Sequence, residues 1–368
     1  MMIHKNPTIE FNVIFGPIEL KSPYLWTEAN SSKPLIDEMG VKHRGRSETV
    51  KRALSDFGID ESFKASANKF KEHYNFEIGI SAVDRTTKEI AEYASEYIDD
   101  KLAAADKQSA PFEKKILVEL DGCEIRTAKM NVIENSDKTT PVYKNPKKEK
   151  IIKWRDVRIG FARPLDRKEK IFVGKMDFYP KVTNQLHSAA ELIGMTSETE
   201  VIGVADGGIG IKEELERQFP NMQFVLDKSH LRDHFYDTVK KMGIEKDERP
   251  KWVEPRVKRI SNGETTEIIE ELVIENDKKP CDRLRRLIGY LKRFSDCLDY
   301  DSFKEKDYPI GSGEIESAHK SVPQKRLKIP GATWHPASIN PMLGLRILRA
   351  DDWWEDFWDQ RKAKLLAA

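Results

Sequence analysis

Two apolar segments of this 368-residue chain end in the same dipeptide, Asp-Gly. Residues 115–120 (KILVEL) lead into Asp121-Gly122, and residues 200–205 (EVIGVA) lead into Asp206-Gly207. Short apolar runs that stop at turn residues are typical of buried β-strands. A single Asp-Gly is more often a plain turn. Two aspartates that each follow a buried strand can instead meet at one edge of a sheet, where open α/β sheets form their ligand sites.

The segments around these strands predict a mixed α/β order. We expect a return strand of a hairpin at 123–130, a loop at 134–150 and further strands at 154–162 and 170–177. A helix at 182–193, the strand at 200–205, a helix at 211–218 and a strand at 222–226 follow. From 231 to 302 the pattern is helical throughout, and another helix follows Gly311-Ser312-Gly313. The C-terminal residues 351–366 predict an aromatic helix, whose Trp353, Trp354 and Trp358 we expect to pack on the core.

The first 110 residues predict a mostly helical region after a short strand at 11–15. Ser47, Ser62 and Ser81 are suitable N-caps for helices at 48–57, 63–74 and 82–97. Two helices joined by a tight turn fit a helix-turn-helix that reads DNA, and a plain helical bundle fits equally well. In the DNA-reading version, the third helix presents Arg85, Thr86, Thr87 and Lys88.

Composition narrows the class of protein. Hydrophobic residues make up 39% of the chain, enough to bury a sizeable core, and the net charge of +1 indicates no particular partner. The three cysteines, Cys123, Cys281 and Cys297, are far apart, which argues against a structural zinc site. We find no signal peptide and no apolar stretch long enough to cross a membrane. These features predict a cytoplasmic protein without membrane contact.

A third carboxylate would turn the two aspartates into a site for hard divalent cations. The segment 309–320 (PIGSGEIESAHK) offers Glu314 and Glu316 at the start of a helix. Because they are two residues apart they point to different sides, so only one can join the aspartates. Three carboxylates suit Mg²⁺ or Mn²⁺, and two such ions can activate an attacking oxygen and stabilise a leaving one. The spacing alone does not choose between the two glutamates.

Four segments resemble the catalytic blocks of bacterial insertion-sequence transposases, most closely the ISKra type, which is related to the mutator-like transposases. They are Asp121-Gly122, 204–207 (VADG), 227–230 (DKSH) and 311–317 (GSGEIES). The resemblance covers about residues 111–358. It implies an RNase H-like mixed sheet flanked by helices, with an all-helical insertion before the last acid. Members often carry N-terminal cysteines that could bind zinc, and this chain has none there.

The resemblance also implies roles for residues. The catalytic triad carries over to Asp121, Asp206 and Glu316, because the glutamate of the family is followed by Ser. The spacings, 206 − 121 = 85 and 316 − 206 = 110, leave room for the insertion. The signature after the second aspartate carries over to Asp227 and His230. The implied divisions are an N-terminal DNA-binding region at 1–110, a catalytic core at 111–230 and 305–368, and the insertion at 231–304.

Asp227 and His230 also admit other interpretations. With His234 they form a D-x-x-H-x-x-x-H run that could hold zinc, although the glutamate expected next to the first histidine of a zinc protease is missing. We favour Asp227 as the cap of the helix after the strand, with His230 near the site or on a phosphate. Asp227 also stays open as a rival to Asp206 for the second acid.

Basic residues near the predicted site are candidates for DNA contact. Residues 138–170 hold twelve Lys or Arg against four acids, and a second basic run follows Glu316. Such patches neutralise phosphates, although a solvated surface explains them as well. The candidates are Arg85, Lys88, Lys147, Lys148, Arg158, Lys320, Lys325, Arg326 and Lys328.

The sequence therefore predicts a DDE-type DNA transposase that cleaves the ends of an insertion sequence and transfers the strand to new DNA. We expect two Mg²⁺ or Mn²⁺ ions as cofactors, double-stranded DNA as partner, a homo-oligomer that pairs two element ends, and a nucleoid-associated location. Two alternatives stay open: an RNase H-like nuclease or resolvase that cuts without joining, and a non-catalytic DNA-binding descendant of a transposase.

Overall fold

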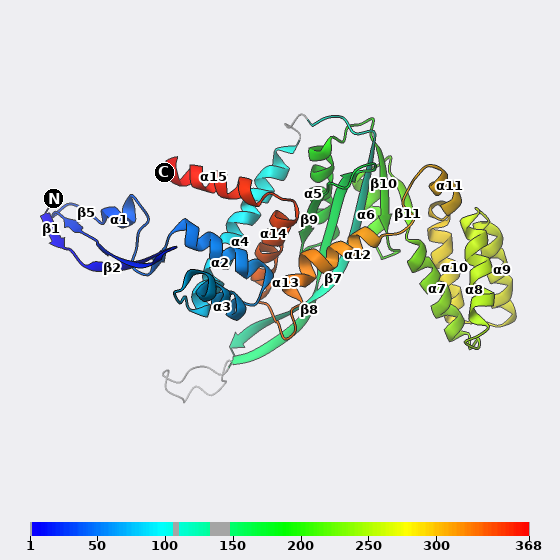
Figure 1. The fold of residues 1–368 in the computed structure, drawn as a ribbon. Coiled ribbons are helices and arrows are strands. Elements are labelled where there is room, and N and C mark those ends of the chain that lie inside the picture. The colour runs from blue at the N-terminus through cyan, green and yellow to red at the C-terminus, as the bar shows by residue number, and fades with distance from the viewer. Residues whose placement is uncertain (1, 106–109, 133–147, 368) are drawn as a thin grey trace.

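The chain has a mixed α/β architecture built around one five-stranded sheet (Figure 1). The structure, a computed structural model, describes residues 2–105, 110–132 and 148–367. The strand order is β11-β10-β7-β8-β9, with β7 (Lys115–Val132), β8 (Lys148–Pro164), β9 (Ile171–Lys175), β10 (Glu200–Ala205) and β11 (Gln223–Leu226). β7, β8 and β9 are antiparallel, whereas β10 and β11 run parallel to β7. From residue 154 onward the predicted order of two strands, a helix, a strand, a helix and a strand is confirmed.

Helices cover both faces of the sheet. α5 (Tyr179–Ile193) covers one face, where Leu186 packs against Gly160 of β8. On the opposite face, α14 (Ile339–Ala350) places Leu343 against Gly174 of β9. α12 (Gly313–His319) lies on the same face over β7 and continues through a π-helical turn at Lys320–Gln324 into α13 (Lys325–Leu327). α6 (Ile211–Gln218) connects β10 to β11.

β7 corrects one sequence-based expectation. Asp121 does not end a strand, because β7 runs on as a single strand from Lys115 to Val132, and residues 123–130 are its continuation rather than a return strand. Gly122 stays extended and pairs with Arg158, and the alternation of buried side chains carries on to Ile125. The return strand is β8, which begins at Lys148 inside the predicted loop. The rest of that loop, 133–147, lies outside the described residues.

The segment predicted to be helical, 231–302, consists of helices joined by short connections. The helices are α7 (Lys228–Lys241), α8 (Arg249–Ser261), α9 (Thr265–Lys278), α10 (Asp282–Arg293) and α11 (Tyr300–Glu305), with a 3-10 turn at Ser295–Cys297. α7 packs on α8, α8 on α9, α9 on α10 and α10 on α7. We call α7–α11 the helical unit. Figure 1 shows it at the β11 end of the sheet.

The N-terminal region is less helical than predicted. Residues 2–46 form two small three-stranded sheets, β1-β4-β5 and β3-β2-β6. Their strands are β1 (Met2–Lys5), β2 (Thr8–Val13), β3 (Gly16–Lys21), β4 (Tyr24–Trp26), β5 (Ser31–Ser32) and β6 (Gly45–Arg46), with one helical turn, α1 (Pro34–Asp37). Alternation at Ile9 and Phe11, both buried, explains β2, and Gly16 with φ of 123° allows the tight turn into β3.

Three helices follow, α2 (Glu48–Asp60), α3 (Phe63–Tyr74) and α4 (Ile80–Ala103). Ser47 and Ser62 cap the first two as predicted, whereas α4 starts after Gly79 rather than at a Ser81 cap. The predicted end of α2 at Gly58 is also wrong, because Gly58 lies inside the helix where a side chain would overlap Thr87. Thr86 and Thr87 are buried, so α4 does not present them to DNA.

The C-terminal helix α15 (Trp354–Ala367) packs on this assembly. Trp354 and Trp358 are buried, which confirms the packing role expected of them. Across the described residues, the structure holds no helix with the length and apolar character needed to span a bilayer.

Candidate active site

Asp121 lies within β7, and Asp206 directly follows the neighbouring parallel strand β10. β10 pairs with β7 from Glu200↔Lys115 to Val204↔Glu119, so each pair is 85 residues apart (204 − 119 = 85). Continued two residues further, past the end of β10, this register would bring Asp206 opposite Asp121. Adjacent strands are about 4.8 Å apart, so the pairing carries the two aspartates to the same edge of the sheet.

Tyr179, at the start of α5, is a further group near the candidate acids. Burial raises the pKa of its phenol, and the charges of Asp206 and Asp121 raise it further, whereas Arg158 lowers it. The guanidinium of Arg158 stacks 4.2 Å from the centre of the Tyr179 ring, and Arg158 faces Gly122 across the β7–β8 pair. The same guanidinium also donates to the Asp177 carbonyl.

α12 lies along β7 and contacts it at two points with matching spacing. The Ile315 N–H donates to Glu119 Oε2 at 2.8 Å, and His319 Nε2 lies 3.3 Å from Asp121 Oδ2. Four residues of helix rise about 6 Å and two residues of strand rise about 6.6 Å. The two contacts therefore repeat along both elements, and they hold the helix in place over Asp121.

The two glutamates of α12 have different surroundings. Glu314 receives two hydrogen bonds from Arg163, at 2.7 and 3.2 Å, and also pairs with Lys170. Glu316 is on the side that faces α7, with Oε1 3.7 Å from His230 Nε2. It is three residues before His319, so the two share one side of the helix. Glu314 is thus paired with the side chains of Arg163 and Lys170, and Glu316 is the glutamate on the Asp121 side of α12.

Asp227 is buried and accepts hydrogen bonds on both carboxylate oxygens. Oδ1 accepts from the Ser229 hydroxyl at 2.6 Å and from the His230 N–H at 2.8 Å, so Asp227 caps α7 as predicted. Oδ2 accepts from the N–H and the hydroxyl of Ser312 at 2.5 and 2.8 Å. Asp227 therefore joins the start of α7 to the start of α12, and its oxygens are fully used in this role.

Sequence reasoning missed two residues of the site. Glu119 is fully buried beneath α12, and desolvation raises the pKa of its carboxyl to about 8 despite the hydrogen bond from Ile315. The signal was present, because Glu119 is the one charged residue among the apolar residues 116–120. His319 was read as part of a basic surface run, yet it is buried against Asp121.

His319 and Asp121 form an ion pair without an aligned hydrogen bond. Burial lowers the pKa of the imidazole, but the nearby carboxylate outweighs it and raises the pKa to about 9. Burial likewise raises the pKa of Asp121, and the contacts with His319, Gly122 and His230 together bring it below its ordinary value. The pair is therefore charged at neutral pH.

The three candidate acids have the ligand atoms that a hard divalent cation prefers. Asp121, Asp206 and Glu316 supply carboxylate oxygens, which Mg²⁺ and Mn²⁺ prefer. Within the described parts of the chain, no three or more His, Cys, Asp or Glu side chains are grouped closely enough to hold an ion as they stand. Asp121 and Glu316 each face a histidine instead. Asp227, His230 and His234 likewise form no such group in these parts of the chain.

The predicted DNA-contacting residues divide into four groups: exposed, paired with an acid, buried, and outside the described residues. Arg158 is among the paired ones, 3.7 Å from Asp156. Arg85, Lys320 and Lys328 are exposed. Lys88 pairs with Asp84 at 2.8 Å, and Lys325 pairs with Asp60 at 3.1 Å. The prediction that Arg326 contacts DNA is wrong. Its side chain is buried between the rings of Phe63 and Trp334 and donates to the Gly58 carbonyl at 2.8 Å. Lys147 lies outside the described residues, as does the side chain of Lys148.

Comparison with known proteins gives a distant structural likeness and no family. No family model matches the chain, and no curated protein matches its sequence. Among solved structures, a chain of the Drosophila P element transposase strand transfer complex is similar at a TM-score of 0.30 and 12% sequence identity. That match covers 87% of this chain and 82% of the other.

Proposed function

We propose that this protein is a DDE-type DNA transposase with an RNase H-like core, and that Asp121, Asp206 and Glu316 are its catalytic acids. The observation that carries the proposal is the parallel pairing of β7, which holds Asp121, with β10, which directly precedes Asp206, together with the docking of the Glu316 helix on Asp121. The sheet order, with three antiparallel strands followed by two parallel ones, supports the RNase H-like assignment. Glu314 is less suited to the role, because Arg163 and Lys170 hold it.

Each catalytic residue would have a role that follows from its position in the fold. Asp121 and Asp206 would hold a cation between neighbouring strands, and Glu316 would add a ligand from α12. A pair of Mg²⁺ or Mn²⁺ ions held there would supply activation of the attacking oxygen and neutralisation of charge on the leaving oxygen. Arg158, whose backbone pairs with Gly122, would neutralise a phosphate of the bound DNA. In such chemistry the protein mainly positions groups, so no nucleophilic side chain is required.

A strand-transfer assay tests this function. The substrate is a labelled duplex carrying the DNA that flanks the gene, with Mn²⁺ or Mg²⁺ and a supercoiled target plasmid. We expect cleavage at the element end followed by joining of the labelled 3′ end to the plasmid, and no product from a shuffled duplex. Cleavage without joining would favour the nuclease or resolvase alternative. Binding without either reaction would favour the non-catalytic DNA-binding alternative.

Mutation of the exposed basic residues should affect DNA binding, whereas mutation of the buried Arg326 should affect stability. Lys320→Ala and Lys328→Ala should each weaken duplex binding on all sequences and reduce the salt dependence of log Kd by about one unit, because each would remove one phosphate contact. Both variants should melt like the wild type. Arg326→Ala should instead destabilise the fold by about 2–4 kcal/mol, because it removes a buried hydrogen bond and two ring contacts.

Fluorescence anisotropy at several salt concentrations and thermal melting separate these outcomes. Unchanged salt dependence in Lys320→Ala and Lys328→Ala would remove this surface from the DNA path. Normal melting of Arg326→Ala would contradict its structural role.

A further inference from the structure

Tyr290, on α10 of the helical unit, packs directly on the turn that carries Asp206. A side-chain carbon built on Gly207 would overlap the hydroxyl and ring of Tyr290. Gly207 therefore leaves the space that this tyrosine occupies. On its other side, the Tyr290 ring lies 4.3 Å from the ring of His234 and 5.0 Å from that of Phe294. The ring thus joins the helical unit to the backbone next to the second acid.

The hydroxyl of Tyr290 is buried and has no hydrogen-bond partner within the described parts of the chain. A buried phenol usually finds a partner, because leaving the group unpaired costs about 1–3 kcal/mol. Burial raises the pKa of this phenol, the charges of Asp206 and Asp227 raise it further, and Arg293 lowers it. Asp227 is already saturated by Ser229, His230 and Ser312. Asp206 and its turn are the neighbours that remain for the Tyr290 hydroxyl.

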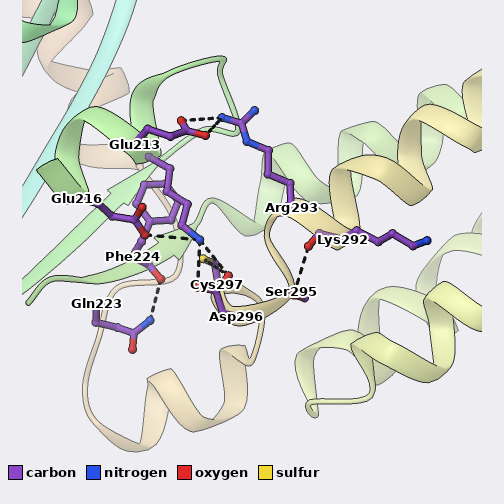
Figure 2. Close-up of polar contacts among 10 residues, drawn as sticks. Glu213, Glu216, Gln223, Phe224, Lys292, Arg293, Ser295, Asp296 and Cys297 are labelled. Atoms are coloured by element: carbon purple, nitrogen blue, oxygen red, sulfur yellow. Dashed lines mark hydrogen bonds and ion pairs between the residues drawn. The ribbon is translucent and has the colours of Figure 1, made fainter. Parts of the chain in front are cut away.

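The position of α10 is held by ion pairs to α6, the helix that follows Asp206. Arg293 donates to both oxygens of Glu213 at 2.7 and 2.8 Å (Figure 2). Lys212 contacts both oxygens of Asp296 at 3.0 Å and lies 3.6 Å from Glu216. These contacts join the end of α10 to the α/β part of the chain, so Tyr290 does not depend on the helical unit alone for its place.

We propose that Tyr290 is a positioning residue for Asp206: the docked helical unit uses its ring and hydroxyl to hold the Asp206-Gly207-Gly208 turn. This turn is otherwise held by a short-range bond, since the Gly208 N–H donates to Asp206 Oδ1 at 2.9 Å. The helical unit thereby completes the site instead of only lying beside it. The inference deepens the proposed function, on which it rests for the catalytic role of Asp206.

Amide hydrogen exchange of residues 204–210 tests the contact without requiring activity. Tyr290→Ala should raise the exchange rate of this segment about tenfold or more, because the turn loses its cover. Tyr290→Phe keeps the ring and should change exchange less. Tyr300→Phe is the matched control, since Tyr300 is also a buried phenol of the helical unit without a partner in the described residues, and it should leave the segment unchanged.

Mn²⁺-dependent DNA cleavage and Mn²⁺ titration provide the functional readouts. In both Tyr290 variants we expect kcat to fall about 10- to 100-fold and the half-saturating Mn²⁺ concentration to rise, with KM for DNA unchanged. Arg293→Glu should produce the same pattern, and the exchanged pair Arg293→Glu with Glu213→Arg should restore it. A merely structural role would change the melting temperature without changing the Mn²⁺ dependence.

The outcomes separate this inference from the proposed function. Normal exchange at 204–210 and normal Mn²⁺ dependence in folded Tyr290→Ala would overturn the role of Tyr290. If Asp121→Asn retained the full activity of the wild type, the proposed catalytic function would fail, while the exchange result would still decide whether Tyr290 holds the turn.

Discussion

Asp121→Asn and Glu316→Gln are each expected to lower the rate of Mn²⁺-dependent DNA cleavage at least about 1000-fold, which corresponds to about 4 kcal/mol of activation free energy. Each substitution keeps the shape of the side chain and removes the negative charge that a cation needs. Steady-state cleavage of a labelled duplex measures the effect. Thermal melting checks that both variants remain folded.

Glu314→Gln is the matched control on the same helix. It removes the same charge two residues away, where the side chain faces Arg163 and Lys170 instead of His230. We expect a small loss of stability and a change in cleavage rate below about tenfold, because Glu314 acts through helix position only. If Glu314→Gln abolished cleavage while Glu316→Gln did not, the assignment of the third acid would be wrong.

Asp227→Ala is expected to destabilise the fold by about 3–5 kcal/mol. The substitution leaves four donors from Ser229, His230 and Ser312 without their acceptor and removes the cap of α7. Asp227→Asn should cost less, since one oxygen remains to accept. Chemical denaturation measures both. A loss below about 1 kcal/mol in Asp227→Ala would contradict its role between α7 and α12.

The same residue predicts a pH dependence. Burial raises the pKa of the Asp227 carboxyl, but the hydrogen bonds from Ser229, Ser312 and His230 together bring it below its ordinary value. Its stabilisation is therefore present above the unfolded pKa of about 4 and is lost as pH falls through the lower folded pKa. The difference in unfolding free energy between wild type and Asp227→Asn should stay constant at neutral pH and shrink below about pH 4. A constant difference down to pH 2 would contradict this.

Local patterns were sufficient for much of the fold. The apolar run before Asp206 predicted β10 with its observed bounds, and the periodicity and caps did the same for α3 and α6. β7 was misread because Asp-Gly is a common turn signal, and only pairing with Arg158 across the sheet keeps Gly122 extended. The small N-terminal sheets were missed because short strands carry too few residues for a reliable period.

The candidate site, like the fold, could be predicted only in part from local sequence patterns. The spacing of 85 residues between the two aspartates is equal to the register of β7 and β10, a relation that becomes visible only once the strands are known to be adjacent. Glu314 and Glu316 are equivalent in sequence, and their difference comes from Arg163 and His230, which are remote along the chain. The burial of Arg326 likewise depends on contacts with Phe63 and Gly58 that no local pattern encodes.

Crystals soaked in Mn²⁺ provide the most direct test of the shared cation site, through an anomalous-difference map at the manganese edge. We predict peaks that touch carboxylate oxygens of Asp121 and Asp206, with Glu316 turned from His230 toward them, and loss of these peaks in Asp121→Asn crystals. Manganese bound elsewhere, with Asp121 still paired to His319 and no density between the two aspartates, would contradict the account.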